Sequence, residues 1–223
     1  MSGFVIAVDG PAASGKGTVS AGLAARYGLP MLDSGLLYRA VGVAVAKAGG
    51  DLDDPAVAGA AARALDPASL ADPALRTRAA GEAASRVAVH PEVRAALLDL
   101  QRAFAARASG AVIDGRDIGT VIAPQAPAKL FVTARPEVRA ERRWRQLAGQ
   151  GEAVALETVL ADIRARDARD SARAASPLVR ADDAVLLDTS EMTIDEAADA
   201  ARRIVEAAHA RWERSRTANP TTP

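Results

Sequence analysis

The sequence predicts a three-layer α/β/α fold built around a parallel sheet. Five short apolar segments, of which residues 3–8 are the first, show no regular alternation of polar and apolar side chains. Such runs are typical of parallel strands that helices cover on both faces. Segments with helical spacing separate these runs along the chain, which is the order that strand–helix–strand units require.

The expected strands are short and rich in β-branched residues. The first ends at Asp9-Gly10, the second follows Pro30, and the third is followed by Gly115. Glycine and proline at these points are typical of the turns that separate elements. The expected strands are residues 3–8, 31–32, 111–114, 129–133 and 184–188.

The expected helices are bounded by glycine and proline. Gly28 and Pro30 end the first helix, Gly49 and Gly50 close the second, and Pro91 begins a later one. The expected helices are residues 18–27, 36–47, 79–89, 91–108, 136–148, 156–169 and 194–211. Residues 51–110 hold no strand candidate and are expected to form a helical insert outside the sheet, whereas residues 213–223 are expected to be a disordered tail.

Composition excludes several classes of protein. The 28 basic and 28 acidic residues balance, which argues against a broad nucleic-acid or anionic-membrane surface. The chain has no cysteine, so disulfide scaffolds, thiol catalysis and cysteine-ligated metals are excluded. We see no signal-peptide pattern and no apolar run of about 18 residues. We therefore expect a single-domain cytoplasmic monomer without nucleic-acid or membrane partners.

The strongest motif lies between the first expected strand and the first expected helix. It fits the pattern G-x-x-x-x-G-K of a phosphate-binding loop, or P-loop. Glycines let the backbone wrap around a phosphate, while loop N–H groups and the helix N-terminus point toward the anion. The lysine adds a positive charge near the β- and γ-phosphates of ATP. The expected ATP-binding residues are Gly10, Pro11, Ala12, Ala13, Ser14, Gly15, Lys16, Gly17 and Thr18.

One position departs from the motif. Gly17 stands where the pattern has serine or threonine, and the hydroxyl follows at Thr18. We expect Mg²⁺ to accompany ATP and to be held through the nucleotide and water molecules, with Thr18, Asp33 and Asp114 as candidate neighbours. Asp33 and Asp114 each end an expected strand, at the edge where open α/β sheets bind ligands. Each acid could instead cap the turn after its strand.

Five further motifs follow the P-loop. They are LDSGLLYR at 32–39, HPEVR at 90–94, DGRDIGT at 114–120, RARDARD at 164–170 and SPL at 176–178. In this order they make the chain resemble the bacterial cytidylate kinase family, from the P-loop to about Asp188. The resemblance implies ATP-dependent phosphorylation of CMP or dCMP. With it, we expect a five-stranded sheet in the order 2-3-1-4-5.

The resemblance also implies three parts within one P-loop kinase domain. The core would comprise residues 1–33, 109–148 and 176–212, the nucleoside-monophosphate (NMP) binding insert about 34–108, and a mobile lid about 149–175. Residues 61–78 lack the small strand-containing segment that family members often carry there. The insert is therefore expected to be shortened.

The resemblance assigns residues to the acceptor nucleotide. Asp117, Arg94 and Ser85 would read cytosine, because a carboxylate accepts from the amino group and the other two can donate to N3 and O2. Arg39 and Arg116 would bind the acceptor phosphate, since guanidinium groups bind phosphate oxygens in pairs. The expected CMP-binding residues are Ser34, Arg39, Ser85, Arg94, Arg116, Asp117, Arg166, Asp170 and Arg173, and the expected catalytic residues are Lys16, Arg116, Arg166 and Arg173.

Alternatives remain at this level. Asp117 could be a turn acid, Ser34 could cap its helix, and residues 164–173 could form a solvated, salt-bridged helix. The acceptor could be UMP, AMP or shikimate, although a uracil carbonyl would face the Asp117 carboxylate unfavourably. A nucleotide-dependent switch is a further candidate, but it needs no arginines for an acceptor phosphate. Arg142 and Arg143 could join the donor side, although we expect them mostly to face solvent, and we expect His90, Trp144 and Trp212 to be structural.

Overall fold

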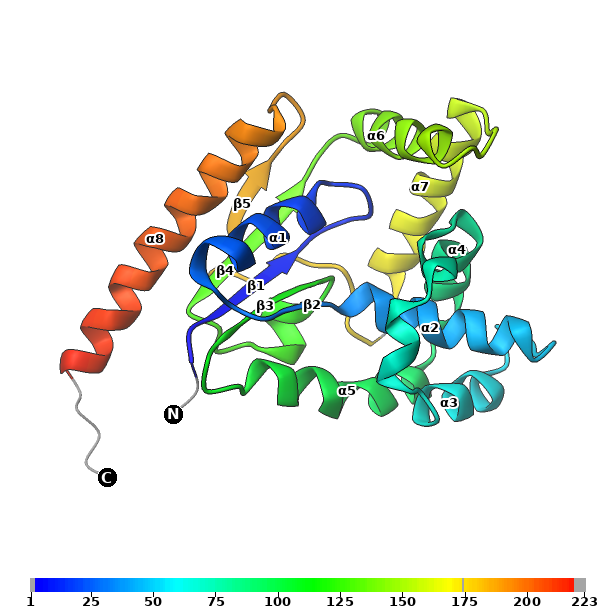
Figure 1. Ribbon diagram of the computed structural model, residues 1–223, viewed down its shortest axis with the longest axis horizontal. Coiled ribbons are helices and arrows are strands. Elements are labelled where there is room, and N and C mark those ends of the chain that lie inside the picture. The colour runs from blue at the N-terminus through cyan, green and yellow to red at the C-terminus, as the bar shows by residue number, and fades with distance from the viewer. Residues whose placement is uncertain (1–2, 174, 219–223) are drawn as a thin grey trace.

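The computed structural model describes residues 3–173 and 175–218 (Figure 1). The strands are β1 (Val5–Asp9), β2 (Met31–Asp33), β3 (Ala111–Gly115), β4 (Ala128–Thr133) and β5 (Val185–Asp188). The α-helices are α1 (Lys16–Tyr27), α2 (Ser34–Lys47), α3 (Pro55–Arg63), α4 (Arg78–Val87), α5 (Pro91–Ala105), α6 (Pro136–Gly149), α7 (Leu156–Ala172) and α8 (Ile194–Ala218). Shorter helical turns are η1 (Pro67–Ala71), η2 (Pro73–Arg76) and the π-helical η3 (Ile118–Ile122).

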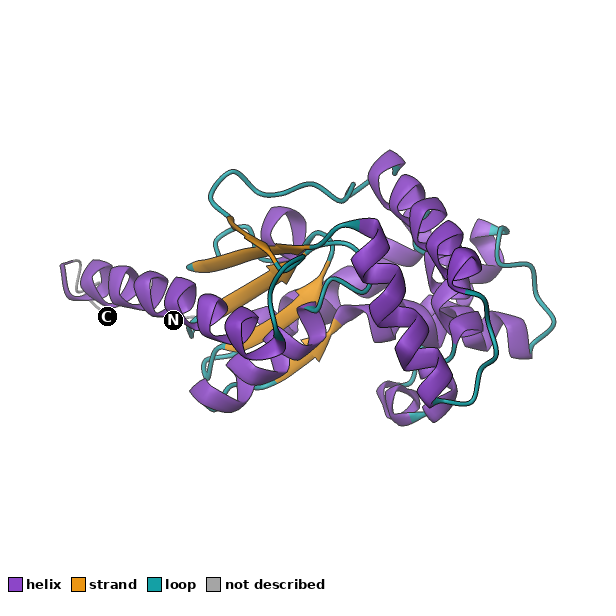
Figure 2. Ribbon diagram, turned by 90° about the horizontal axis from the view of Figure 1, so that it is seen from above, coloured by secondary structure: helices purple, strands orange, loops and turns teal. Residues whose placement is uncertain are grey.

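The five strands form one parallel sheet in the order β2-β3-β1-β4-β5, which confirms the expected topology. Helices lie on both sides of this sheet, as the view from above shows (Figure 2). Asp33 at the end of β2 is in register with Asp114 of β3, and Asp9 of β1 is in register with Gly115. Acidic side chains therefore end neighbouring strands at the edge of the sheet that carries the P-loop.

Alternate residues of β1 face two separate cores. Val5 and Ala7 pack into a cluster with α2, α3, α4 and α5. Ile6 and Val8 pack into a second cluster with α1 and α8, and both are fully buried. Burying an aliphatic side chain of this size stabilises the fold by about 1.5–3 kcal/mol. The uninterrupted apolar sequence of β1 thus supplies both cores, as expected of a central parallel strand.

A third, smaller cluster joins α6 and α7. Its buried members are Ala140 and Leu147 of α6 with Val159 and Ile163 of α7, and the P-loop residue Ala13 packs against them. Helix α7 also contacts α4, and in Figure 1 these helices lie side by side on the right of the molecule. The α6–α7 pair therefore contacts both the P-loop and helix α4. Residues 51–110, which include α4, contain no strand, as expected.

Two expectations need correction. Val185 and Leu186 of β5 are 42% and 49% exposed, because β5 is an edge strand and only Leu187 joins the core with α8. Residues 213–218 are helical rather than disordered, because arginine and glutamate favour helix and Arg216 stacks on Trp212, 4.6 Å from the ring centroid. Residues 219–223 lie outside the described residues. Among the helices of residues 3–173 and 175–218, none has the length and apolar character needed to cross a membrane.

Candidate active site

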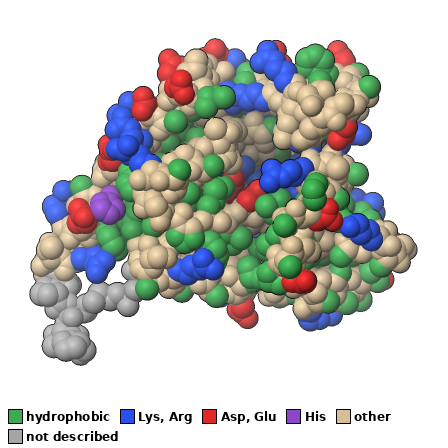
Figure 3. All heavy atoms as spheres, viewed as in Figure 1, with side chains coloured by type: hydrophobic (Ala, Val, Ile, Leu, Met, Phe, Trp, Pro, Cys, Tyr) green, Lys and Arg blue, Asp and Glu red, His purple; other side chains and the backbone are tan. Residues whose placement is uncertain are grey.

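A cleft of about 1420 Å³ lies at the edge of the sheet that carries the P-loop. The P-loop, α2, α4, the α6–α7 pair and the start of α8 contribute to its walls. Figure 3 shows a hollow in the molecular surface with basic side chains at its margin. The arginines that line the cleft are Arg39, Arg76, Arg78, Arg142, Arg143, Arg145 and Arg166. This concentration of guanidinium groups suits an anionic ligand.

The P-loop depends on two glycines. Gly10 has φ 144°, and a Cβ atom there would lie 1.9 Å from the carbonyl oxygen of Val132, so a side chain does not fit. Gly15, with φ 92°, immediately precedes α1. The start of α1 opens into the cleft, where Gly17 and Thr18 are exposed. The unpaired N–H groups at a helix N-terminus attract anions.

Lys16 is buried inside the P-loop. Its Nζ donates to the carbonyl oxygen of Pro11 at 2.9 Å and lies 3.8 Å from Asp114 Oδ1. Burial, followed by the nearby Arg116 cation, lowers the pKa of Lys16 to about 8. Burial likewise raises the pKa of Asp114 to about 6, although Lys16 opposes this shift. An anion bound at the loop would favour the charged form of Lys16.

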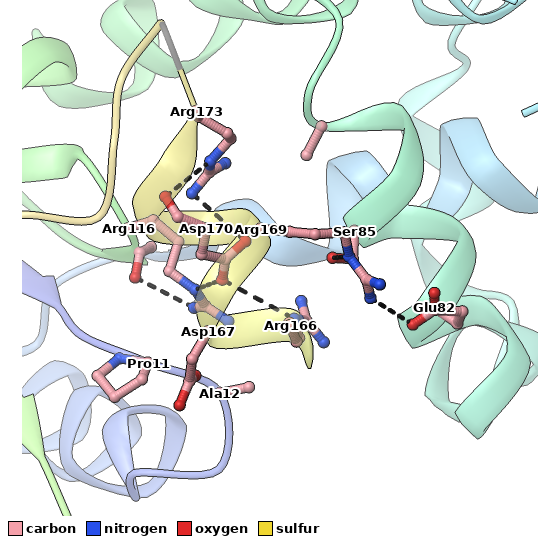
Figure 4. A network of polar contacts seen from close by, with 12 residues as sticks. Pro11, Ala12, Glu82, Ser85, Arg116, Arg166, Asp167, Arg169, Asp170 and Arg173 are labelled. Atoms are coloured by element: carbon pink, nitrogen blue, oxygen red, sulfur yellow. Dashed lines mark hydrogen bonds and ion pairs between the residues drawn. The ribbon is translucent and has the colours of Figure 1, made fainter. Parts of the chain in front are cut away.

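Asp170 on α7 is the centre of a cluster of three arginines (Figure 4). Its Oδ2 accepts a hydrogen bond from Arg116 Nε at 2.9 Å and lies 3.9 Å from Arg166 Nε. Its Oδ1 lies 3.5 Å from Arg173 Nη2, and Arg173 Nε donates to the Asp170 carbonyl oxygen at 3.2 Å. The structure therefore brings together four of the residues that the sequence predicted as CMP-binding.

This cluster carries more positive than negative charge, because three guanidinium groups surround one carboxylate. Burial and the Arg116 cation lower the pKa of Arg166 to about 9. Within the described part of the chain, Arg166 Nε and Arg173 Nη2 are buried and make no hydrogen bond, although Arg173 Nη2 lies within ion-pair distance of Asp170. Leaving a buried donor unpaired costs about 1–3 kcal/mol, and more if it is charged. A bound phosphate group could pair both donors and balance the charge.

A second cavity, of about 120 Å³, lies beside Arg94 and Asp117. Arg94 Nη2 donates to Asp117 Oδ2 in a buried ion pair. The Arg94 guanidinium also lies over the ring of Tyr38, 5.6 Å from its centroid, and Tyr38 lines the same cavity. A carboxylate, a guanidinium and an aromatic ring offer the acceptor, the donors and the apolar surface with which a nucleobase interacts.

Ser85 on α4 faces α7. Its Oγ accepts a hydrogen bond from Arg169 Nε at 3.0 Å, and Arg169 Nη2 pairs with Glu82 at 2.7 Å (Figure 4). Arg78 of α4 makes a further ion pair with Asp162 of α7 at 2.6 Å. These contacts join α4, within residues 51–110, to α7.

Arg39 and Ser34 both lie on α2. Arg39 Nη1 donates to the carbonyl oxygen of Leu75 at 2.7 Å, while the side chain lines the large cleft. Ser34 is buried in the first turn and does not cap the helix; Asp33 does, because its Oδ1 accepts from the N–H of Gly35 at 2.9 Å. The capping alternative for Ser34 is therefore wrong.

Four of the nine predicted acceptor residues line one of the two cavities, and Ser34, Ser85, Arg116, Asp170 and Arg173 line neither. Arg39 and Arg166 line the large cleft, together with Lys16, Asp33 and most of the P-loop. Arg94 and Asp117 line the small one. The sequence analysis implied a single acceptor site, whereas the structure places Arg39, predicted to bind the acceptor phosphate, and Arg94 and Asp117, predicted to read the base, along separate hollows.

The expectation that Arg142 and Arg143 face solvent is wrong. Arg142 Nη1 and Nη2 donate to the hydroxyl and carbonyl oxygens of Thr189 at 2.9 and 2.7 Å. Arg143 is half-buried, lines the cleft and donates to Gln146 Oε1 at 2.8 Å. Helix α6 packs beside the P-loop, and the local sequence of α6 gave no sign of this. His90, Trp144 and Trp212 have structural contacts, with Leu52, Val154 and Phe4 respectively.

The arrangement of these motifs can be compared with known families. A family model for cytidylate kinase matches residues 6–208. This chain belongs to the cytidylate kinase family. The match begins within β1 and ends within α8, so it includes the P-loop, the Asp170 cluster and both cavities. The resemblance drawn from the sequence motifs is thus confirmed.

Curated relatives agree with the cytidylate kinase match. A protein of Caulobacter vibrioides named cytidylate kinase is 74% identical over 209 residues, which cover 94% of this chain and 98% of the relative. A cytidylate kinase of Xanthobacter autotrophicus is 68% identical over 207 residues, with coverages of 93% and 99%. The crystal structure of TT1252 from Thermus thermophilus aligns with a TM-score of 0.47 at 25% identity, covering 93% of this chain and 98% of that one.

The sequence analysis of this cytidylate kinase family member missed polar residues that connect the site. Asp9 Oδ1 and Oδ2 accept from the N–H groups of Ile118 and Gly119 at 2.8 and 2.7 Å, directly after Asp117. Its position at the end of an apolar strand, before the P-loop, was a usable signal. Arg139 and Thr189, described below, had no comparable signal, because each reaches the site only through the tertiary structure.

Proposed function

We propose that this chain transfers the γ-phosphoryl group of ATP to CMP or dCMP, giving ADP and CDP or dCDP. Membership of the cytidylate kinase family supports this reaction. The observation that carries it structurally is the group of Arg116, Arg166 and Arg173 around the single carboxylate of Asp170. Transfer of a phosphoryl group spreads negative charge over its oxygens, and such a group of cations stabilises that charge.

In the proposed reaction, a phosphate oxygen of CMP attacks the γ-phosphorus of ATP. The bond from that phosphorus to the β–γ bridging oxygen breaks, and ADP leaves with that oxygen. The phosphates of ATP lie along residues 10–18, with Lys16 beside the β- and γ-groups. Arg116, Arg166 and Arg173 neutralise the acceptor phosphate and the transferring group. Positioning and charge stabilisation supply the catalysis, so no covalent enzyme intermediate is needed.

We further propose that Mg²⁺ accompanies ATP. Asp33 and Asp114 are neighbours across β2 and β3, and a Cβ atom at Gly17 would only touch Asp114 Oδ2, at 3.7 Å, so space beside this carboxylate opens toward α1. Oxygen ligands suit Mg²⁺, and two carboxylates leave most of its coordination to phosphate oxygens and water. Asp33, Asp114 and the Thr18 hydroxyl would hold those waters. The ion supplies charge neutralisation for the β- and γ-phosphates.

The base of the acceptor is proposed to enter the small cavity. There the Asp117 carboxylate accepts from the cytosine amino group and Arg94 donates to a ring acceptor, while Ser85, which does not line this cavity, is proposed to donate to the ring from α4. Ser34 and Arg39 bind the acceptor from α2, and Arg166 and Asp170 bind its ribose. For UMP, a carbonyl oxygen would oppose the Asp117 carboxylate, which supports CMP as the preferred acceptor.

The proposed parts of the enzyme follow from these roles. Residues 34–108 form the NMP-binding insert and residues 149–175 the lid, while the remaining residues up to 212 form the core. The contacts between α4 and α7 support a lid that meets the insert. We propose a monomer that works in the cytoplasm, where both nucleotides are available.

The deciding experiment is an assay of ADP release from ATP with CMP, dCMP, UMP, AMP or no acceptor. We expect release to require an acceptor and to be fastest with CMP or dCMP. A faster reaction with UMP or AMP would replace the proposed acceptor. Slow release that no acceptor accelerates would instead support a nucleotide-dependent switch.

A further inference from the structure

Two arginines of α6 connect this helix to the backbone of the P-loop. Arg139 is 3% exposed, and its Nη1 donates to the carbonyl oxygen of Ala12 at 3.2 Å. Three residues later, Arg142 donates to both oxygens of Thr189, whose Oγ1 lies 3.0 Å from the carbonyl oxygen of Ser14. Helix α6 therefore reaches two P-loop carbonyl groups, one directly and one through Thr189.

The hydroxyl proton of Thr189 has two acceptors within reach, the carbonyl oxygens of Ser14 and Thr133. The carbonyl oxygen of Thr133 lies 3.1 Å from Oγ1, but it already accepts the N–H of Thr189 at 2.8 Å. Arg142 Nη1 donates to the same hydroxyl oxygen and so occupies a lone pair. The Ser14 carbonyl oxygen is the nearer acceptor and does not already accept the N–H of Thr189, which favours donation of the hydroxyl proton to Ser14.

These contacts fix the direction of N–H groups in the loop. A trans peptide unit is planar, so its C=O and N–H point in opposite directions. Holding the carbonyl of Ala12 turns the N–H of Ala13 away from Arg139, and holding the carbonyl of Ser14 turns the N–H of Gly15 away from Thr189. Both Ala13 and Gly15 line the cleft, and in residues 3–173 and 175–218 neither N–H donates to a protein group.

The backbone at this point is strained. Ala13 has φ 59°, a left-handed conformation that costs a residue with a side chain about 1–2 kcal/mol. Such a conformation persists only where the surroundings hold it. The two held carbonyl groups belong to the residues on either side of Ala13, so they are placed to maintain it.

Arg139 also connects the loop to α7. Its Nη1 and Nη2 donate to the two carboxylate oxygens of Asp167 at 3.0 and 2.6 Å. Figure 4 shows Asp167 beside Ala12 and directly below the Asp170 cluster. Asp167 follows Arg166, so this bidentate pair restrains the helix that carries the proposed acceptor-side arginines.

We propose that Arg139 and Thr189 are positioning residues that hold the P-loop N–H groups toward the phosphates of the donor nucleotide. Neither residue needs to touch the nucleotide. This inference rests on the proposed function of the P-loop as the ATP site. It predicts a selective loss of donor-nucleotide affinity when either contact is removed.

The test measures the dissociation constants of ADP and of CMP by calorimetry on the full chain. Thr189→Val keeps the shape of the side chain and removes the hydroxyl, so we expect ADP to bind about tenfold more weakly, with CMP changed less than twofold. Thr189→Ser keeps the hydroxyl and should bind ADP like the unchanged protein. Val205 lies on the buried face of α8, and Val205→Ala leaves a cavity in the core that lowers stability without changing a P-loop contact. This variant should leave the dissociation constants of ADP and CMP unchanged.

A second pair of variants tests Arg139. Arg139→Met removes the hydrogen-bond donors but keeps most of the length of the side chain. It should raise the dissociation constant of ADP by about tenfold or more. Arg164→Met on α7 is the matched control, because among the described residues the exposed guanidinium of Arg164 pairs only with Glu137. It should leave the dissociation constant of ADP unchanged. If ADP affinity is unchanged in Arg139→Met and Thr189→Val, or if CMP affinity falls as much as ADP affinity in Thr189→Val, the inference is overturned. Because Arg139→Met also breaks the pair with Asp167, the CMP comparison applies to Thr189→Val alone. If the unchanged protein fails to bind ADP, the proposed function itself fails.

Discussion

Arg94 and Asp117 form an ion pair in which the two side chains are 9% and 6% exposed. The pair joins α5 to the residue that precedes η3, and the small cavity lies beside it. Arg94 binds Oδ2 of the carboxylate. Among the described residues, no donor is hydrogen-bonded to Oδ1. One oxygen of Asp117 is thus fixed by the protein and the other is available to a ligand.

This relationship makes Asp117→Asn a test of base recognition. The amide can present either its oxygen or its NH₂, so a uracil carbonyl would no longer face a charge. We expect the ratio of kcat/KM for CMP over UMP to fall about tenfold or more, which corresponds to about 1.4 kcal/mol. Steady-state kinetics with both acceptors measures the ratio. The CMP reaction should weaken mainly through KM, because the contact is remote from the transferring group.

The variant also needs a stability control. It leaves the buried Arg94 without its counter-ion, and breaking a buried pair costs up to about 3–5 kcal/mol. Thermal unfolding should therefore show a lower Tm for the variant. The kinetic measurements are made at a temperature well below that Tm. A folded variant with the original CMP-to-UMP ratio would show that Asp117 does not read the base and that the turn-acid alternative holds.

Lys16→Ala tests the P-loop. Lys16 is the buried cation beside the start of α1, and its interaction with phosphate strengthens as charge develops on the transferring group. We expect kcat to fall about a hundredfold or more, with a much smaller change in KM for CMP. Circular dichroism should show an intact fold. A folded variant with near-normal turnover would remove Lys16 from the mechanism.

The sequence was sufficient for the sheet and for the P-loop because both depend on local patterns. The apolar run of β1 must be buried on both faces, and Gly10 is required where a Cβ atom would meet the backbone of Val132. The order of the strands within the sheet was expected from the resemblance to the cytidylate kinase family. The apolar run of β5 failed as a sign of burial, because exposure there depends on its place at the edge of the sheet.

The candidate site could be predicted only residue by residue. The motifs identified Asp170 and its arginines, but the excess of positive charge around it depends on α7 meeting the end of β3. Arg139, Arg142 and Thr189 are ordinary residues in the sequence. Arg139 and Thr189 contact P-loop residues more than 120 positions away, such as Ala12 for Arg139, and Arg142 reaches the loop only through Thr189. No local pattern encodes such pairings.

Arg173→Ala tests the lid side of the site. Arg173 is buried, and its Nη2 makes no hydrogen bond among the described residues, so it is placed to bind a phosphate oxygen. We expect kcat to fall about a hundredfold. Arg164→Ala on the neighbouring exposed face of α7 should change kcat less than twofold, because surface ion pairs contribute little. Equal effects of the two substitutions on kcat would contradict the proposal that Arg173, rather than the exposed side of α7, contacts the phosphates.

The pKa values of Lys16 and Asp114 predict how activity depends on pH. Burial lowers the pKa of Lys16 to about 8 and raises that of Asp114 to about 6, and both groups lie at the proposed phosphate site. Above pH 8 Lys16 loses its positive charge, and below pH 6 Asp114 loses its negative charge. Because kcat/KM reports the free enzyme, we expect kcat/KM for ATP to be bell-shaped, with limbs near these two values.

Two variants and one comparison separate this explanation from titration of ATP itself. Lys16→Arg keeps its proton throughout the range, so its residual activity should lack the alkaline limb, and Asp114→Asn should lack the acid limb. Bound phosphates raise the pKa of Lys16, so the alkaline limb of kcat should lie at higher pH than that of kcat/KM. The measurement is a series of initial rates with saturating Mg²⁺ and CMP. Limbs that persist unchanged in both variants would assign the titration to the nucleotide rather than to this pair.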